Sequence, residues 1–107
     1  MARWFMFVAV PLCLAQPSVA AADKAALCTA TAQVVHDAAR ARATGKQAAR
    51  IKRDLTRGPD RVEDRLLPMV DPLVDWVFTV DAGDLGAPGA AERVTEWYRA
   101  GCMGFQP

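Results

Sequence analysis

The sequence predicts an all-α fold, a small bundle of four or five short helices tied by one disulfide. Apolar residues recur at three- and four-residue steps, which is the spacing of one helix face, and no segment alternates as a strand does. Glycine and proline interrupt this pattern at short intervals, so each helix must be short. Two cysteines stand near the ends of the expected domain, where one bridge would close almost all of it.

Residues 1–20 are typical of a cleavable secretory signal, which we call the expected leader. Arg3 is followed by an apolar run, residues 4–15, whose length suits the apolar core of a signal peptide. The run is too short for a bilayer span, which needs roughly 17–25 residues. Small residues allow cleavage before Ala21 or, alternatively, before Asp23. A lipoprotein at Cys13 is disfavoured because the preceding Leu12 is not small.

Residues 21–107 are therefore expected to form a single helical domain, and the protein to be periplasmic or secreted. The first helix is predicted over residues 23–43, where alanine, the best helix former, is dense. Asp23 is the expected cap at its start, and Gly45 suits the left-handed residue just past its end.

Four further segments follow. A short helix is predicted over residues 46–55 and a third from Arg61, opened by a capping box of Asp60 and Glu63. Pro68 should break this third helix, and Asp71-Pro72 should restart it as the apolar helix 71–80. Residues 82–89 are expected to be a loop, and the last helix to span residues 90–101.

The cysteines predict one structural disulfide. Removal of the expected leader leaves Cys28 and Cys102, an even pair in an oxidising compartment. The rival roles are weak, because redox-active pairs are usually close in sequence and a zinc site needs about four ligands. A small core supplies little stability by itself, so a covalent crosslink is expected to stabilise the domain.

The residues carry little that could support catalysis. His36 is the only histidine, and the only serine, Ser18, lies in the expected leader, so no nucleophile and base can be paired. His36 is expected on a helix surface, where it could act as a weak pH sensor. The aspartates of residues 71–84 match no calcium loop, and no phosphate-binding motif appears. We expect a protein that is not an enzyme and that takes no metal or cofactor.

Charge is distributed unevenly along the chain. Without Arg3 the acidic and basic residues balance, so no global field draws the protein to nucleic acid, which we do not expect as a partner. Residues 40–65, however, contain nine basic and four acidic residues. This stretch predicts an anion-binding surface that could face a membrane, formed by Arg40, Arg42, Lys46, Arg50, Arg53 and Arg57. The simpler interpretation is that these residues are solvated and pair with the acidic half of the chain.

A pattern of motifs resembles a group of small exported bacterial helical proteins of unknown function. Its parts are Cys28, the helix end at residues 41–45 (Ala-Arg-Ala-Thr-Gly), the apolar segment 75–78 with its aromatic pair, and Trp97-Tyr98 shortly before Cys102. The resemblance implies only the helical fold and the Cys28–Cys102 bridge. The acid-activated periplasmic chaperones are similar in class, being small, helical and held by one disulfide.

The expected function is that of a non-catalytic periplasmic or secreted module that acts by protein–protein interaction, with an envelope protein as its partner. One alternative is a periplasmic stress chaperone that exposes its apolar helix when conditions change. The other is a cationic-surface protein that binds anionic lipid or an envelope polymer.

Overall fold

The computed structural model describes residues 19–105, and no strand occurs among them, which confirms the all-α class. The elements in chain order are α1 (Val19–Ala43), α2 (Ala48–Thr56), the 3₁₀ helix η2 (Asp64–Leu66), α3 (Leu67–Val77), α4 (Ala82–Leu85) and α5 (Ala90–Gly104). Most of the expected leader lies outside the described residues.

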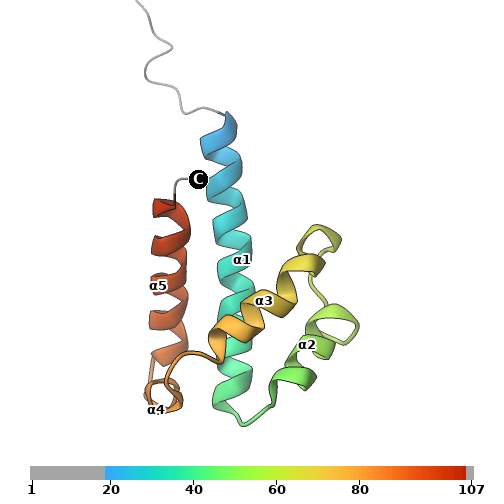
Figure 1. The fold of residues 1–107 in the computed structure, drawn as a ribbon, viewed down its shortest axis with the longest axis vertical. Coiled ribbons are helices and arrows are strands. Elements are labelled where there is room, and N and C mark those ends of the chain that lie inside the picture. The colour runs from blue at the N-terminus through green and yellow to red at the C-terminus, as the bar shows by residue number, and fades with distance from the viewer. Residues whose placement is uncertain (1–18, 106–107) are drawn as a thin grey trace, which may run out of the picture.

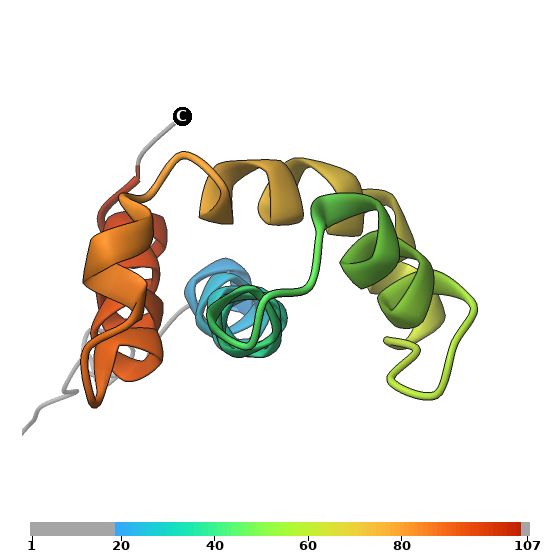
Figure 2. The ribbon, with the colours of Figure 1, turned by 90° about the horizontal axis from the view of Figure 1, so that it is seen from below.

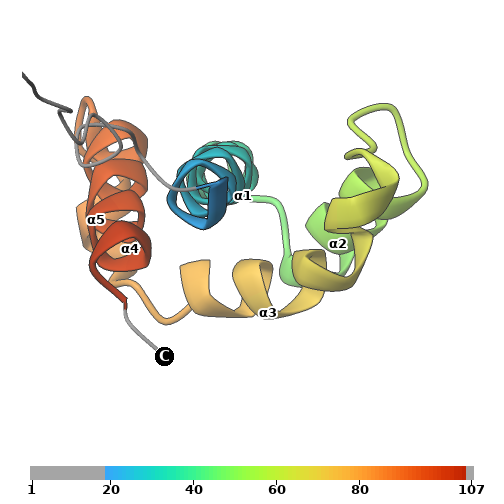
Figure 3. The same cartoon turned by 90° about the horizontal axis from the view of Figure 1, so that it is seen from above.

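Helix α1 is the centre of the fold, and the other elements are arranged around it. Helix α5 runs antiparallel beside α1, and α3 crosses α1 and packs against both α1 and α2 (Figure 1). Seen from below, α5, α3 and α2 form an arc with α1 inside it (Figure 2). The same arc appears from above (Figure 3). The disulfide between Cys28 and Cys102, with 5.8 Å between the Cα atoms, joins the early part of α1 to the late part of α5.

Helix α1 begins earlier and ends as predicted. It starts at Val19, so Asp23 lies inside the helix and the predicted cap at Asp23 is wrong. The reason is the alanine run of residues 20–22, which favours continuing the helix in the N-terminal direction. At the other end Gly45 has φ +97°, and the amides of Gly45 and Lys46 donate to the carbonyls of Arg42 and Ala41. This pair of bonds is the Schellman motif that terminates many helices.

The segment after α2 differs from the prediction. No helix begins at Arg61 and no capping box forms; the chain is irregular until η2, and α3 then runs without a break across Pro68 to Val77. Pro68 is tolerated because it is the second residue of α3, where its missing amide hydrogen would have no intrahelical partner. Pro72 lies inside α3, so the restart predicted at Asp71 is also wrong. Because proline has no amide hydrogen, α3 lacks the backbone hydrogen bond that residue 72 would otherwise donate to the Pro68 carbonyl.

Residues 82–89 contain the short helix α4 instead of being loop throughout. The Gly83 amide donates to Asp81 Oδ1 at 2.8 Å, which caps the helix start. Leu85, only 4% exposed, then joins the core. Gly89 has φ +75° and immediately precedes α5, which extends to Gly104, three residues beyond the predicted end.

The core consists mainly of small aliphatic side chains. Val35 of α1 and Val70, Val74 and Val77 of α3 are fully buried, and Ile51 of α2 extends this cluster. The face of α1 that points away from this core is polar and exposed, with Gln33 and Asp37 among its residues. The other sides of α1 pack against α3 and α5, and this packing positions α5 and its aromatic residues.

Candidate binding surface

The six residues predicted to bind anions are divided between different surroundings. Lys46 and Arg50 both face Asp54, with N–O distances of 3.6 and 3.9 Å. Arg40 lies exposed on α1, separate from the exposed Arg53 and Arg57 of the α2 region. The six therefore differ in their contacts, and anion binding by them stays a prediction.

Arg42 points inward and holds the end of α3. Its Nη1 donates to the carbonyls of Val77 and Val80, at 2.8 and 2.6 Å, and its guanidinium lies 4.8 Å from the centre of the Phe78 ring. The last carbonyls of a helix have no partner within the helix and carry partial negative charge, which a cation stabilises. The charge of Arg42 is therefore used within the fold.

Other basic side chains of the 40–65 stretch are also paired. Lys52 Nζ lies 2.8 Å from Asp75 Oδ1, Arg61 pairs with Asp64, and Arg65 pairs with Glu63. Arg53 and Arg57 make no ion pair with any residue that the structure describes. Arg50 and Arg53 lie on one face of α2 at i, i+3 spacing, and Arg57 is the residue that follows the end of this helix, with φ −140°. We call Arg50, Arg53 and Arg57 the α2 arginine stripe.

A cluster of aromatic side chains lies where the end of α3 meets α5. We call Trp76, Trp97 and Tyr98 the aromatic surface. The Trp76 ring centre is 6.2 Å from that of Trp97, edge to face, and 5.7 Å from that of Tyr98. Trp97 is nevertheless 67% exposed. These contacts order a large apolar side chain that remains open to solvent.

Tyr98 connects the aromatic surface to the interior of the protein. Its hydroxyl donates to Thr31 Oγ1 at 3.0 Å, and Thr31 in turn donates to the Leu27 carbonyl at 2.9 Å. Thr31 is only 1% exposed, so this chain of hydrogen bonds satisfies a buried hydroxyl that would otherwise be costly. The orientation of the Tyr98 ring is thereby tied to α1.

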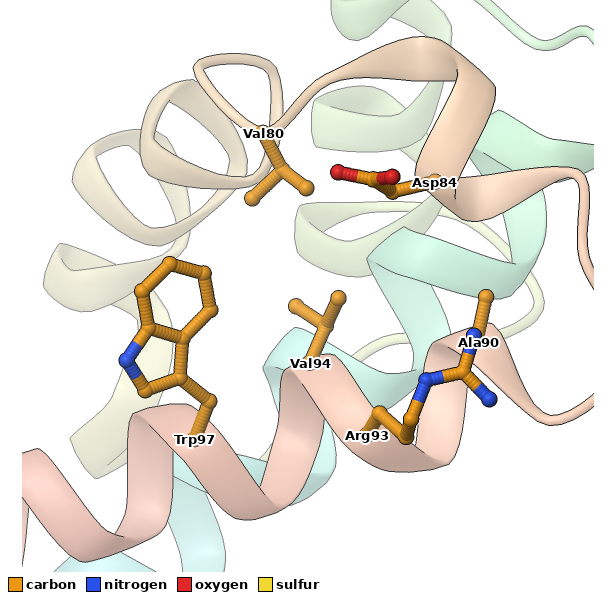
Figure 4. A pocket seen from close by; sticks show the side chains of 6 residues that line it. All are labelled: Val80, Asp84, Ala90, Arg93, Val94 and Trp97. Carbon is orange, nitrogen blue, oxygen red and sulfur yellow. The ribbon is translucent and has the colours of Figure 1, made fainter.

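Two hollows adjoin the aromatic surface. The first has a volume of about 320 Å³ and lies between Val80 and Asp84 on one side and Arg93, Val94 and Trp97 of α5 on the other (Figure 4). The second, about 310 Å³, lies against Trp76, Trp97 and Tyr98. Trp97 lines both hollows, so a ligand that covers its indole would have recesses on either side.

A third hollow lies over the bridge between the start of α1 and the end of α5. We call it the disulfide groove. Its volume is about 530 Å³, and it is lined by Lys24, Leu27, Cys28, Tyr98, Gly101, Cys102 and Phe105. Phe105 is 65% exposed and forms one edge. The lining is apolar apart from Lys24, whose ammonium donates to the Phe105 carbonyl.

His36 forms a contact between helices. Its Nε2 lies 3.0 Å from Glu92 Oε2 of α5, while Nδ1 is buried and 3.8 Å from Asp37 Oδ1, too far for a hydrogen bond. The hydrogen bond from His36 lowers the pKa of the Glu92 carboxyl. The imidazole thus links α1 to α5 through a carboxylate.

Within residues 19–105 no three histidine, cysteine, aspartate or glutamate side chains are grouped so that they could hold a metal ion. None of the described helices combines the length and the apolar character needed to cross a membrane.

The aromatic surface is the feature that the sequence did not locate. Trp97 and Tyr98 follow Val94 by three and four residues, so helical spacing allows either to share its side of α5 and does not tell which of the two faces the core. In the structure Tyr98 is half-buried and Trp97 points outward. The signal in the sequence was the adjacent aromatic pair, since neighbouring helical residues are about 100° apart and cannot both be buried against one neighbour.

Comparison with protein-family models, with curated proteins and with solved structures finds no match to this chain.

Proposed function

We propose that the protein is a non-catalytic helical module, periplasmic or secreted, that binds an envelope protein through the aromatic surface. A Cys28–Cys102 disulfide is typical of an oxidising, extracytoplasmic setting. The expected leader, residues 1–20, supports the finer assignment to the periplasm or the medium.

The exposure of Trp97 is the observation that carries this proposal. Tryptophan and tyrosine are enriched among the residues that dominate binding energy at protein interfaces. The contacts with Trp76 hold the Trp97 ring before any partner arrives, so less side-chain freedom is lost on binding. The recesses on either side of the ring could receive apolar side chains of the partner.

The test is recovery of partners from the cells that produce the protein, after chemical crosslinking in the envelope. The native protein is compared with Trp97→Ser and with the matched control Met103→Ser. Met103 is exposed on the same helix but lines neither hollow beside Trp97. We expect one partner that the native protein and the control recover equally, and that Trp97→Ser binds at least about tenfold more weakly.

Recovery that is the same for all three proteins would contradict the proposal. Many unrelated clients, bound more strongly as the pH falls, would favour the stress-chaperone alternative instead.

The α2 arginine stripe supports the second candidate, binding to anionic lipid or an envelope polymer. Arg53 and Arg57 are exposed and unpaired among the described residues, so their charges could face phosphate or carboxylate groups. An Arg53→Gln/Arg57→Gln double variant belongs in the same experiment. If it loses the envelope association while Trp97→Ser keeps it, the cationic surface is the functional one.

A further inference from the structure

We propose that the disulfide groove binds a single-chain anionic amphiphile of the fatty-acid type, with the apolar chain along the groove and the carboxylate at Lys24. Trp97, which carries the proposed function, does not line the groove, although Tyr98 belongs to both the groove and the aromatic surface. The volume of about 530 Å³ lies in the range of small-molecule sites, roughly 300–1,000 Å³.

Residue 101, which lines the groove, is an exposed glycine. A Cβ added at Gly101 would meet no atom within 4 Å, and the residue lies in α5 without a left-handed φ. Neither close packing nor backbone conformation therefore requires glycine here, although glycine in a helix costs about 1 kcal/mol relative to alanine. A larger side chain at residue 101 would have open space to extend into beside the other lining residues.

The chemistry of the lining selects an acyl chain over a peptide. A peptide would bring amide and carbonyl groups that need partners, and burying them unpaired is unfavourable. The lining offers few: the Tyr98 hydroxyl already donates to Thr31, and Leu27, Phe105 and the bridge are apolar. A hydrocarbon chain has no such requirement.

The position of Lys24 specifies the charge of the head group. Lys24 is the one charged residue in the groove lining, and no carboxylate accompanies it there. The ammonium has three N–H donors, and the Phe105 carbonyl takes one of them. The remaining donors can bind a carboxylate at the rim, where a cationic head group would be repelled.

The test is isothermal titration calorimetry of the disulfide-bonded protein with dodecanoate, kept below its micelle-forming concentration. We expect one saturable site that prefers dodecanoate to dodecyltrimethylammonium, which has the same chain and the opposite charge. Octanoate should bind at least about tenfold more weakly, since each buried methylene contributes about 0.8 kcal/mol. Equal binding of the anionic and cationic amphiphiles, or heats that do not saturate, would overturn the proposal.

Two variants locate the site. Gly101→Leu should abolish dodecanoate binding without lowering the thermal midpoint, because leucine is a better helix former and its Cβ meets nothing. Lys24→Met should weaken dodecanoate binding about tenfold and remove the preference for the anion. Met103→Ala and Trp97→Ser should both keep the native affinity within about twofold, as is usual for residues outside a site. Native affinity in Gly101→Leu would show that the amphiphile binds elsewhere.

Discussion

Arg42 illustrates how a single side chain can hold the end of a helix that is distant in sequence. Its guanidinium donates to the carbonyls of Val77 and Val80 and packs over Phe78. The Val77 carbonyl also accepts from the Val80 amide at 3.2 Å, so Arg42 adds a second, charged donor at this helix end. The position of the α3 end, and with it the turn that leads to α4, depends on this contact.

We therefore predict that Arg42→Met destabilises the protein although the new side chain keeps most of the apolar contact with Phe78. A hydrogen bond to a charged group contributes about 1.5–3 kcal/mol. Both bonds come from Nη1 and the Val77 carbonyl keeps the Val80 amide as a donor, so we expect the loss of one such bond, about 2 kcal/mol. Thermal unfolding followed by circular dichroism should show a midpoint about 8–16 °C lower. Arg53→Met is the control and should change the free energy of unfolding by no more than about 0.5 kcal/mol. Equal midpoints for the two variants would refute the role of Arg42.

At the scale of the elements, the packing of α2 on α3 includes one ion pair. Lys52 Nζ lies 2.8 Å from Asp75 Oδ1. The hydrogen bond to Asp75 raises the pKa of Lys52 above its usual value of 10.5. A group whose pKa is higher in the folded state contributes stability below its unfolded pKa and loses it as the pH rises through the folded pKa.

Because the pKa of Lys52 is raised in the folded protein, the Lys52–Asp75 pair should lose its stabilising effect in alkaline solution. Below about pH 10 the native protein should unfold at a higher temperature than Lys52→Met, and the difference should shrink as the pH rises beyond 10.5. Thermal unfolding of both proteins between pH 8 and about pH 12 measures it. A difference that stays constant across this range would mean that the charge of Lys52 does not stabilise the packing of α2 on α3.

At the scale of the whole molecule, the disulfide closes the fold. Cys28 and Cys102 are 74 residues apart, and the bridge joins the central helix to the last one. On the chain-entropy model, closing a loop of this length restricts the unfolded chain and so stabilises the folded state by roughly 4–5 kcal/mol. The core it supports is small and made largely of valine and alanine, so its own contribution is modest.

Cys102→Ser is accordingly expected to lower the thermal midpoint by at least about 10 °C, given that removal of a native bridge typically costs 2–5 kcal/mol. The bridge also predicts that neither Cys28 nor Cys102 is alkylated before reduction, which mass spectrometry measures. Met103→Ser, next to the bridge in sequence, should leave the midpoint nearly unchanged. If Cys102→Ser were as stable as this control, the helices alone would hold the fold.

Local chemistry explains which elements the sequence predicted well. The end of α1 at Gly45 and the span of α2 depend on residues within one turn of the boundary, and both were placed within about two residues. The prolines were misjudged because their effect depends on position within a helix. Pro68 breaks a helix that started at Arg61 but suits one that starts at Leu67.

The sequence by itself predicted the helical class, the termination of α1 and the pairing of Cys28 with Cys102. The first two depend on local propensity, and the pairing follows from the two cysteines that lie outside the expected leader. Only the tertiary structure decided that Arg42 turns inward, that Trp97 faces solvent while Tyr98 is half-buried, and that Gly101 lines a groove. Each of these depends on which helix lies opposite the residue. That is a long-range property, set when α3 and α5 pack on α1, and no pattern within a single helix records it.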